Sequence, residues 1–229
     1  MKKPYIKKYC KISKFSVFIV DGAYIREFID EEFTNFGQHF RFKFIPKNEF
    51  WIDKQNSKDE SKYYIGHLLV ENRLMSQGKS YDYALEQADK KERLERIKSK
   101  HLTKLLKRFN TKKKIIGKVH KKLIKNLSGK IKIWIVHGYI VRSIFFVDFT
   151  EGGHGNVYDF IPHDEVWIDD ELDKKEINFV IVHELHERYL MSKGLEYDLA
   201  HHKSSNLEYY CRHNKKELKK ILQRESRRN

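Results

Sequence analysis

The chain has 229 residues, of which 40% are hydrophobic and 34% charged, and its formal net charge is +15. This composition is ample for one domain of ordinary size or for two small ones. No apolar run approaches the roughly 18–20 residues of a bilayer span, and the basic N-terminus lacks the apolar core of a signal peptide. Two lone cysteines, Cys10 and Cys211, disfavour a disulfide framework and exclude a cysteine-rich zinc site. We therefore expect a soluble, cytoplasmic protein without a membrane partner.

The basic residues are concentrated in the middle of the chain. Residues 89–126 hold sixteen Lys or Arg and three Asp or Glu, a balance of +13. Such a segment favours a polyanionic partner, so nucleic acid is one candidate ligand. The expected contact residues are Lys104, Lys107, Arg108, Lys112, Lys113 and Lys114. A solvated lysine-rich helix is the alternative interpretation, because no recognition motif accompanies the charge.

The sequence repeats itself at a constant offset of 116 residues. FIPKNEFWID (44–53) matches FIPHDEVWID (160–169). IGHLLVENRLMSQGKSYDYA (65–84) matches IVHELHERYLMSKGLEYDLA (181–200). Self-similarity that holds its register over such a distance indicates an internal duplication.

The duplication predicts three parts of the chain. They are a first repeat with a basic N-terminal arm (1–96), a basic linker (97–129) and a second repeat with a basic C-terminal tail (130–229). The linker segments HLTKLLKRF and KVHKKLIKNL are expected to form one or two helices.

Each repeat begins with residues that are typical of strands. FSVFIV in the first copy and IKIWIV in the second are short runs of β-branched and aromatic residues. In the second copy we expect another strand near 139–147, then a glycine-rich loop, EGGHGN. A strand pair follows at about 157–161 and 165–168, with Pro162 at the turn between them.

The pattern then becomes helical. Asp173, with Glu176 three residues later, predicts a helix N-cap, and Gly194 predicts the end of that helix. A second helix is expected over about 197–212. The fold class is thus α+β: two tandem copies of a unit in which a three- or four-stranded, mainly antiparallel sheet is followed by two helices.

The first helix of copy two carries the run His183-Glu184-Leu185-His186-Glu187. Residues four apart lie on one face of a helix, so His183 and Glu187 can bind the same metal ion. Glu184 is rotated by about 100° from His183 and can act as general base on a bound water. The fifth position is Glu instead of the usual His, and a carboxylate oxygen is an acceptable zinc ligand.

A catalytic zinc site needs a third protein ligand and one open position. If the second helix packs antiparallel to the first, His201 lies near Glu187, and we expect it to be that ligand. Glu208 is the alternative. Additional contacts to metal or substrate are expected from His154 and His186.

The first repeat provides an internal comparison. It keeps His67 and Glu71 at the positions of His183 and Glu187. It lacks the base, the third ligand and the loop histidine, since Leu68, Leu85 and Gln38 replace Glu184, His201 and His154. Such a joint loss is expected of a degenerate site. The retained pair has another interpretation: a buried hydrogen bond that locks helix to sheet.

At this point the second copy resembles a known group of proteins. DFTEGGHGNVYDFIPHDEVWIDD and FVIVHELHERYLMSKGLEYDLAHHKSSNLE are similar to small zincin-like metallopeptidase-like proteins of prokaryotes and phages. The resemblance covers one repeat. It implies a minimal zincin-like fold in which His183 and Glu187 bind zinc and Glu184 is the base.

Three functions remain open. The leading hypothesis is a zinc-dependent hydrolase in which a metal-bound water, activated by Glu184, attacks a peptide or other amide carbonyl; its substrate would be a peptide or protein. The alternative is a non-catalytic nucleic-acid-binding or phage accessory protein that uses the basic linker and tails. The third is a structural pseudoenzyme with two inert copies.

Overall fold

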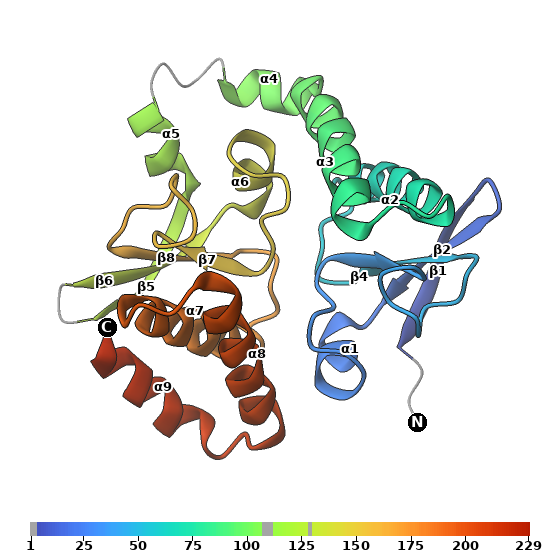
Figure 1. The fold of residues 1–229 in the computed structure, drawn as a ribbon. Coiled ribbons are helices and arrows are strands. Elements are labelled where there is room, and N and C mark those ends of the chain that lie inside the picture. The colour runs from blue at the N-terminus through green and yellow to red at the C-terminus, as the bar shows by residue number, and fades with distance from the viewer. Residues whose placement is uncertain (1–3, 107–111, 128–129) are drawn as a thin grey trace.

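The computed structural model describes residues 4–106, 112–127 and 130–229, and it contains two units of the same design (Figure 1). Each unit is a four-stranded mixed sheet followed by a pair of helices. The duplicated α+β arrangement that the sequence predicts is therefore confirmed.

The strands of the first unit lie in the order β1-β2-β4-β3. They are β1 (Tyr5–Ile12), β2 (Phe15–Val20), β3 (Phe36–Gln38) and β4 (Glu49–Asp53). The outer pairs are antiparallel, but β2 and β4 run parallel. The sequence does not predict this central parallel pair.

The second unit repeats this topology in the order β5-β6-β8-β7, again with a parallel central pair. Its strands are β5 (His120–Leu127), β6 (Ile131–Val136), β7 (Gly152–His154) and β8 (Glu165–Asp169). β7 is thus a short strand within the expected EGGHGN loop, at the edge of the sheet.

The described helices belong to both units and to the segment between them. They are α1 (Gly22–Phe28), α2 (Ser61–Ser76), α3 (Tyr81–Ile97), α4 (Lys100–Leu106), α5 (Lys112–Val119), α6 (Gly138–Ile144), α7 (Ile177–Ser192), α8 (Tyr197–His213) and α9 (Leu218–Arg228). The expected helical pair of copy two is confirmed as α7 and α8. Gly194 lies in the turn between them with φ of 88°, a conformation that favours glycine.

The central strands of each sheet are buried on both faces. In β8, Val166 and Ile168 belong to the core beneath α7 and α9, whereas Trp167 belongs to the core on the α6 side. Successive side chains of a strand point to opposite faces, so an apolar strand of this kind requires a layer on each side. The packing also fixes α7 against β7 and β8.

Two of the expected strands are absent. Most of the segment 139–147, expected as a strand, lies in α6, which begins at Gly138. Gly138 packs so closely against the Asp169 carboxylate that a Cβ would not fit there. Arg142, one turn farther on, is buried and pairs with Asp169. These contacts outweigh the strand propensity of the segment. Residues 157–161 form turns, so only the second member of the expected pair is a strand.

Helix α7 begins later than the capping pattern predicts. Asp173 accepts a hydrogen bond from Lys175 N in a turn before the helix (3.2 Å). The N-cap is Glu176, whose side chain makes no capping hydrogen bond. Its carboxylate pairs instead with Arg26 and Arg212.

The basic linker contains a strand where the sequence predicts a helix. The first segment, HLTKLLKRF, is helical as α4 over its described residues 101–106. KVHKKLIKNL, in contrast, continues from the end of α5 into β5. His120 stacks on Trp134 with ring centroids 4.2 Å apart, and its Nε2 lies 2.7 Å from a Glu165 oxygen. Pairing with β6 thus overrides the helical spacing.

The duplication extends to the first strand of each unit. Tyr5 in β1 donates a hydrogen bond to Glu49 (2.7 Å), just as His120 in β5 contacts Glu165. Both hairpins also have two register shifts at corresponding points. The second sheet therefore begins within the segment expected to be the linker.

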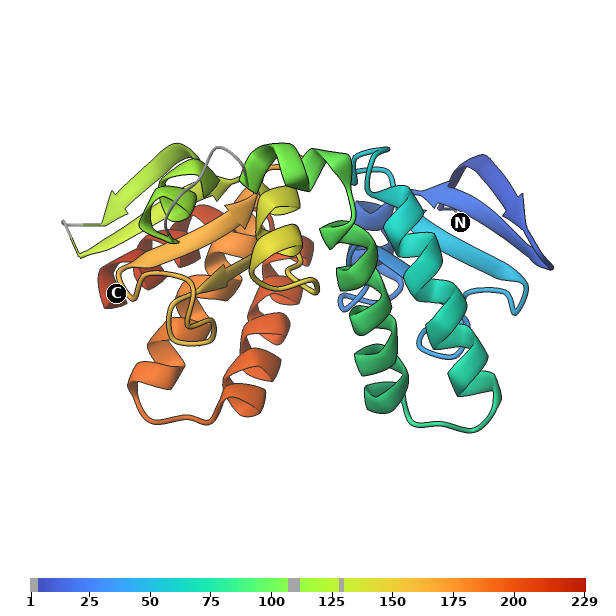
Figure 2. The same ribbon diagram turned by 90° about the horizontal axis from the view of Figure 1, so that it is seen from above.

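An approximate twofold axis relates the units, and Figure 1 views it nearly end-on. Figure 2 shows α3 and α8 near the middle, with α2 and α7 outside them. Contacts are exchanged across this axis: α1 packs against α8, and α6 against α3. Ser57 N donates to Glu171, and at the equivalent positions Asp173 N donates to Gln55. The units thus meet as the subunits of a symmetric dimer do.

Within the described ranges, no helix has both the length and the apolar character needed to cross a membrane.

Candidate metal centre

A cleft of about 270 Å³ lies between the units and is lined by both. The wall from the second unit contains residues of β7, α7 and α8. The wall from the first unit contains the equivalent positions of β3, α2 and α3. The lining residues that bear on chemistry are His67, Glu71, Leu85, Asp148, His183, Glu184, Glu187 and His201, with Glu32 beside them. The three expected ligands of the second unit and the equivalent residues of the first unit thus line the same cleft.

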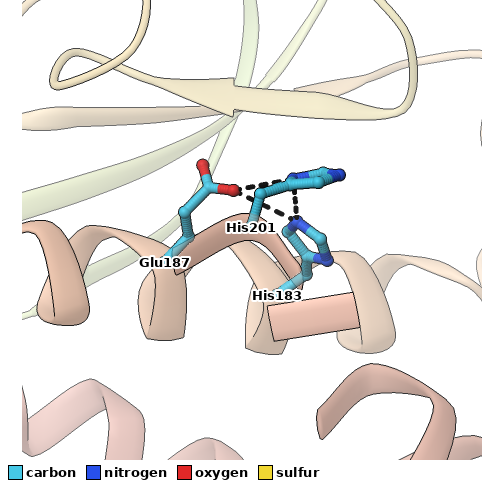
Figure 3. Close-up of side chains that lie close together, drawn as sticks. All are labelled: His183, Glu187 and His201. Atoms are coloured by element: carbon cyan, nitrogen blue, oxygen red, sulfur yellow. Dashed lines mark hydrogen bonds and ion pairs between the residues drawn. The ribbon is translucent and has the colours of Figure 1, made fainter. Parts of the chain in front are cut away.

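Three expected ligands converge on the second-unit wall (Figure 3). His183 Nε2 lies 3.5 Å from Glu187 Oε2, and His201 Nδ1 lies 2.8 Å from the same oxygen. The two nitrogens are 3.2 Å apart. Ligands about 2.0–2.1 Å from a tetrahedral zinc ion are separated from one another by roughly 3.3 Å. The three atoms are therefore spaced as the ligands of a single ion would be.

Local structure explains this convergence. His183 and Glu187 lie one turn apart on α7, and α8 returns alongside α7 after the turn at Gly194. His201, in the second turn of α8, then faces Glu187. The antiparallel pairing expected from the sequence is what joins these side chains.

Glu208 and His154 contact the ligand side chains on the sides that face away from the other ligands. Glu208, expected as an alternative ligand, lies 3.1 Å from the other ring nitrogen of His183, Nδ1. A carboxylate at this place fixes the tautomer and orientation of a metal-binding imidazole. His154 is fully buried, accepts a hydrogen bond from Asn156 N through Nδ1, and has Nε2 3.1 Å from Glu187 Oε1. His154 thereby orients Glu187, and these two residues with Glu184 form a second close group of potential ligands.

Glu184 is a buried carboxyl group that lines the cleft, 7% exposed. Among the described residues, it has no hydrogen-bond or ion-pair partner. Burial first, and then the charge of Glu187, raise its pKa to about 8. Gly152 in β7 leaves room for it, since a Cβ there would lie 3.0 Å from Glu184 Oε1. A group of this pKa can both accept and donate a proton near neutral pH.

The carboxylates around the ligands favour positive charge. Burial lowers the pKa of His183, but Glu187 and Glu208 outweigh it and hold that pKa well above its usual value. The hydrogen bond to Glu187, and then the nearby carboxylate of Glu32, raise the pKa of His201 to about 9. Burial would raise the pKa of Glu187, but His154 and the two ligand histidines bring it far below the usual range. The same carboxylates that favour a protonated imidazole would favour a bound cation, and metal binding would then release protons.

His186 does not belong to the cleft. Its Nδ1 lies 3.1 Å from Glu225 on α9, which packs along the other side of α7. The structure thus places His186 apart from the three converging ligands, and its contact with a metal or substrate stays a prediction. His186 directly precedes Glu187 on α7, so it is rotated by about 100° from that ligand around the helix axis.

The first unit keeps the supporting contacts and lacks the third ligand. His67 Nε2 lies 3.4 Å from Glu71 Oε2. Gln38 donates to Glu71 Oε1 (2.6 Å), in the role that His154 has in the other unit. Leu85 replaces the third ligand, and within the described residues no group of three potential ligands forms there.

A buried chain of hydrogen bonds runs from His183 to the other unit. Glu208 accepts from Arg212 (2.6 Å), Arg212 donates to Glu176 (2.7 Å), and Glu176 accepts from Arg26 of the first unit (3.2 Å). Each link lies in the interior, so the ring of His183 is connected to a side chain beyond the interface.

An equivalent chain runs in the opposite direction, from His67 of the first unit to Arg142 of the second. His67 Nδ1 lies 3.0 Å from Glu92, which accepts from Arg96 (2.8 Å). Arg96 donates to Glu60 (2.5 Å), and Glu60 pairs with Arg142 of the second unit. Sequence reasoning missed both chains. The signal was present, because every Arg and Glu in them is identical at the offset of 116.

The basic residues expected to contact nucleic acid are only partly described. Lys104 is exposed on α4, and residues 112–114 lie in α5. Lys107 and Arg108 lie outside the described residues.

No known protein family, curated protein or solved structure matches the chain. Its function therefore has to be inferred from the geometry of the cleft.

Proposed function

We propose that the second unit binds zinc through His183, Glu187 and His201 and hydrolyses a peptide or other amide bond in the cleft. The observation that carries this proposal is the convergence of two imidazole nitrogens and one carboxylate oxygen at separations of 2.8, 3.2 and 3.5 Å. Two nitrogens and one oxygen from protein are a donor set of catalytic zinc sites. Two ligands one turn apart on a helix beside a short edge strand also support the likeness to zincins.

Zinc in such a site lowers the pKa of water and polarises a carbonyl oxygen. The chain supplies the proton transfers. As a carboxylate, Glu184 accepts a proton from water in the cleft; as a carboxylic acid, it donates that proton to the departing nitrogen. Its buried carboxyl group, with a pKa of about 8, suits both steps. His154 and Glu208 keep Glu187 and His183 oriented.

Zinc content tests the binding site. Purified protein dialysed against zinc and then buffer is expected to retain one equivalent by elemental analysis, and His183→Ala to retain none. His67→Ala and His186→Ala are matched controls, since one changes the equivalent residue of the first unit and the other faces α9. Both should retain zinc. Equal zinc content in wild type and His183→Ala would refute the site.

Cleavage of fluorescein-labelled casein tests the hydrolase. Glu184→Gln is expected to retain zinc and lose the zinc-dependent cleavage by roughly 10²–10⁴-fold, the usual contribution of a general acid–base group. Unchanged cleavage in Glu184→Gln would remove this residue from the mechanism.

A further inference from the structure

The outer nitrogen of His201 faces a carboxylate of the first unit. Glu32, in the loop after α1, places Oε2 3.9 Å from His201 Nε2, within the range of an ion pair. The nearby His201 lowers the pKa of this carboxylate. Because His201 directs Nδ1 at the ligand group, Nε2 is the nitrogen left to carry a proton toward Glu32. Glu32 thus lies beside the outer nitrogen of His201, as Glu208 lies beside that of His183, at a longer distance (3.9 Å against 3.1 Å).

The outer nitrogen of His183 is tied to the first unit less directly. The chain through Glu208, Arg212 and Glu176 ends on Arg26, which is 1% exposed. Arg26 also pairs with Asp53, at the end of β4 in its own unit. The guanidinium is therefore anchored to the first sheet, and it sets the position of Glu176 at the start of α7. Buried, charge-assisted hydrogen bonds of this kind have well-defined geometry.

We propose that the degenerate first unit is a working part of the zinc site, in which Glu32 positions His201 and Arg26 positions His183. The inference rests on the proposed zinc site. The first unit would then contribute to zinc binding although it has no complete set of ligands of its own. Glu32 is a positioning residue, because it acts on the metal through His201.

The twofold arrangement supports this inference, because the support is exchanged in both directions. Asp148 is the equivalent of Glu32 and, like it, lines the cleft. Arg142 is the equivalent of Arg26 and pairs with Glu60. Each histidine on a first helix is therefore linked by a chain of buried contacts to an arginine of the opposite unit. The equivalence also supplies a control for each variant, at a position of the same kind beside the site that lacks its third ligand.

Glu32→Gln and Asp148→Asn form the decisive pair. Zinc affinity is measured on the full chain by competition with a chromophoric chelator, and metal-free melting temperatures are recorded beside it. Loss of an outer partner of a metal ligand typically lowers metal affinity by about 10–100-fold. We expect that loss in Glu32→Gln and none in Asp148→Asn. The visible absorption of the cobalt-substituted protein should change in Glu32→Gln alone, because it reports ligand geometry and not global stability.

The outcomes separate the inference from the zinc site itself. If the wild-type protein binds no zinc, the proposed function fails and the inference fails with it. If wild type binds zinc and Glu32→Gln binds it equally well, only the inference is overturned. Equal weakening in both variants would also overturn it, since a general loss of cleft charge would then explain the effect.

Discussion

Leu85 in the first unit occupies the position of His201 in the second. Because leucine cannot bind a metal ion, the first unit lacks the third ligand. The geometry of the other two positions is preserved. His67 Nε2 lies 3.4 Å from Glu71 Oε2, and the same atoms of His183 and Glu187 are 3.5 Å apart. The outer carboxylate is preserved too, as Glu92. The shared pair alone is therefore compatible with a structural role, and the capacity to bind metal depends on the residue supplied by the second helix.

Restoring that residue should restore binding. Leu85 is half-buried and lines the cleft, so Leu85→His places an imidazole opposite Glu71 without opening the core. We expect the zinc content to rise from one equivalent to two, measured by elemental analysis after dialysis. Leu85→Gln, of similar polarity and without an imidazole, serves as the control. A content of one equivalent in Leu85→His would show that the first unit has lost more than its third ligand.

Asp148 predicts a dependence of stability on pH. Burial, and then the neighbouring acidic groups, raise its pKa from 3.8 to about 7. The folded state thus holds this proton more tightly than the unfolded state does. The stability that Asp148 contributes is fully present below about pH 4, declines as pH rises, and is lost above about pH 7.

Asp148→Asn should remove this decline. As pH rises from 5 to 8, the free energy of unfolding of the variant is expected to increase relative to that of wild type. The increase should be roughly 1–2 kcal/mol after allowance for solvent screening. Urea unfolding at the two pH values measures the gain. A difference between variant and wild type that does not change with pH would contradict the assignment.

At the scale of elements, α7 serves three surfaces at once. Leu185 faces the sheet, His183 and Glu187 face the cleft, and His186 faces α9. The sequence alone identifies the i, i+4 pair because helical periodicity fixes which residues share a face. It does not identify the partner of His186, because α9 reaches α7 only through the tertiary fold.

Other elements were predicted to the extent that local signals agree with tertiary contacts. FSVFIV and IKIWIV form strands, since apolar strand-forming residues there are also buried on both faces. The segment that became α6 failed as a strand prediction because a buried Arg142 and a close-packed Gly138 depend on Asp169, which lies in another strand. The role of Glu208 was missed for a similar reason. Spacing along α8 indicates that it can approach His183, and only the structure reveals which ring nitrogen it meets.

At the scale of the molecule, the interface between the units is built from buried charge. Arg26 and Arg142 each form buried ion pairs with carboxylates of both units. A buried ion pair contributes little net stability, and breaking one is costly because it leaves an unpaired charge. Such a network specifies a single arrangement of the units more than it strengthens their association. The cleft requires that arrangement, because its two walls come from different units.

Arg26→Lys and Arg142→Lys test whether this arrangement serves the zinc site. Lysine keeps the charge and loses the fork that bridges several carboxylates, so both variants should lower the free energy of unfolding by a similar amount, roughly 1–3 kcal/mol. Urea unfolding of the metal-free proteins measures that cost. Zinc affinity should fall by about tenfold in Arg26→Lys only, because its chain ends on His183, whereas the chain from Arg142 ends on His67. If the two variants lose zinc affinity equally, the effect follows stability and not the position of His183.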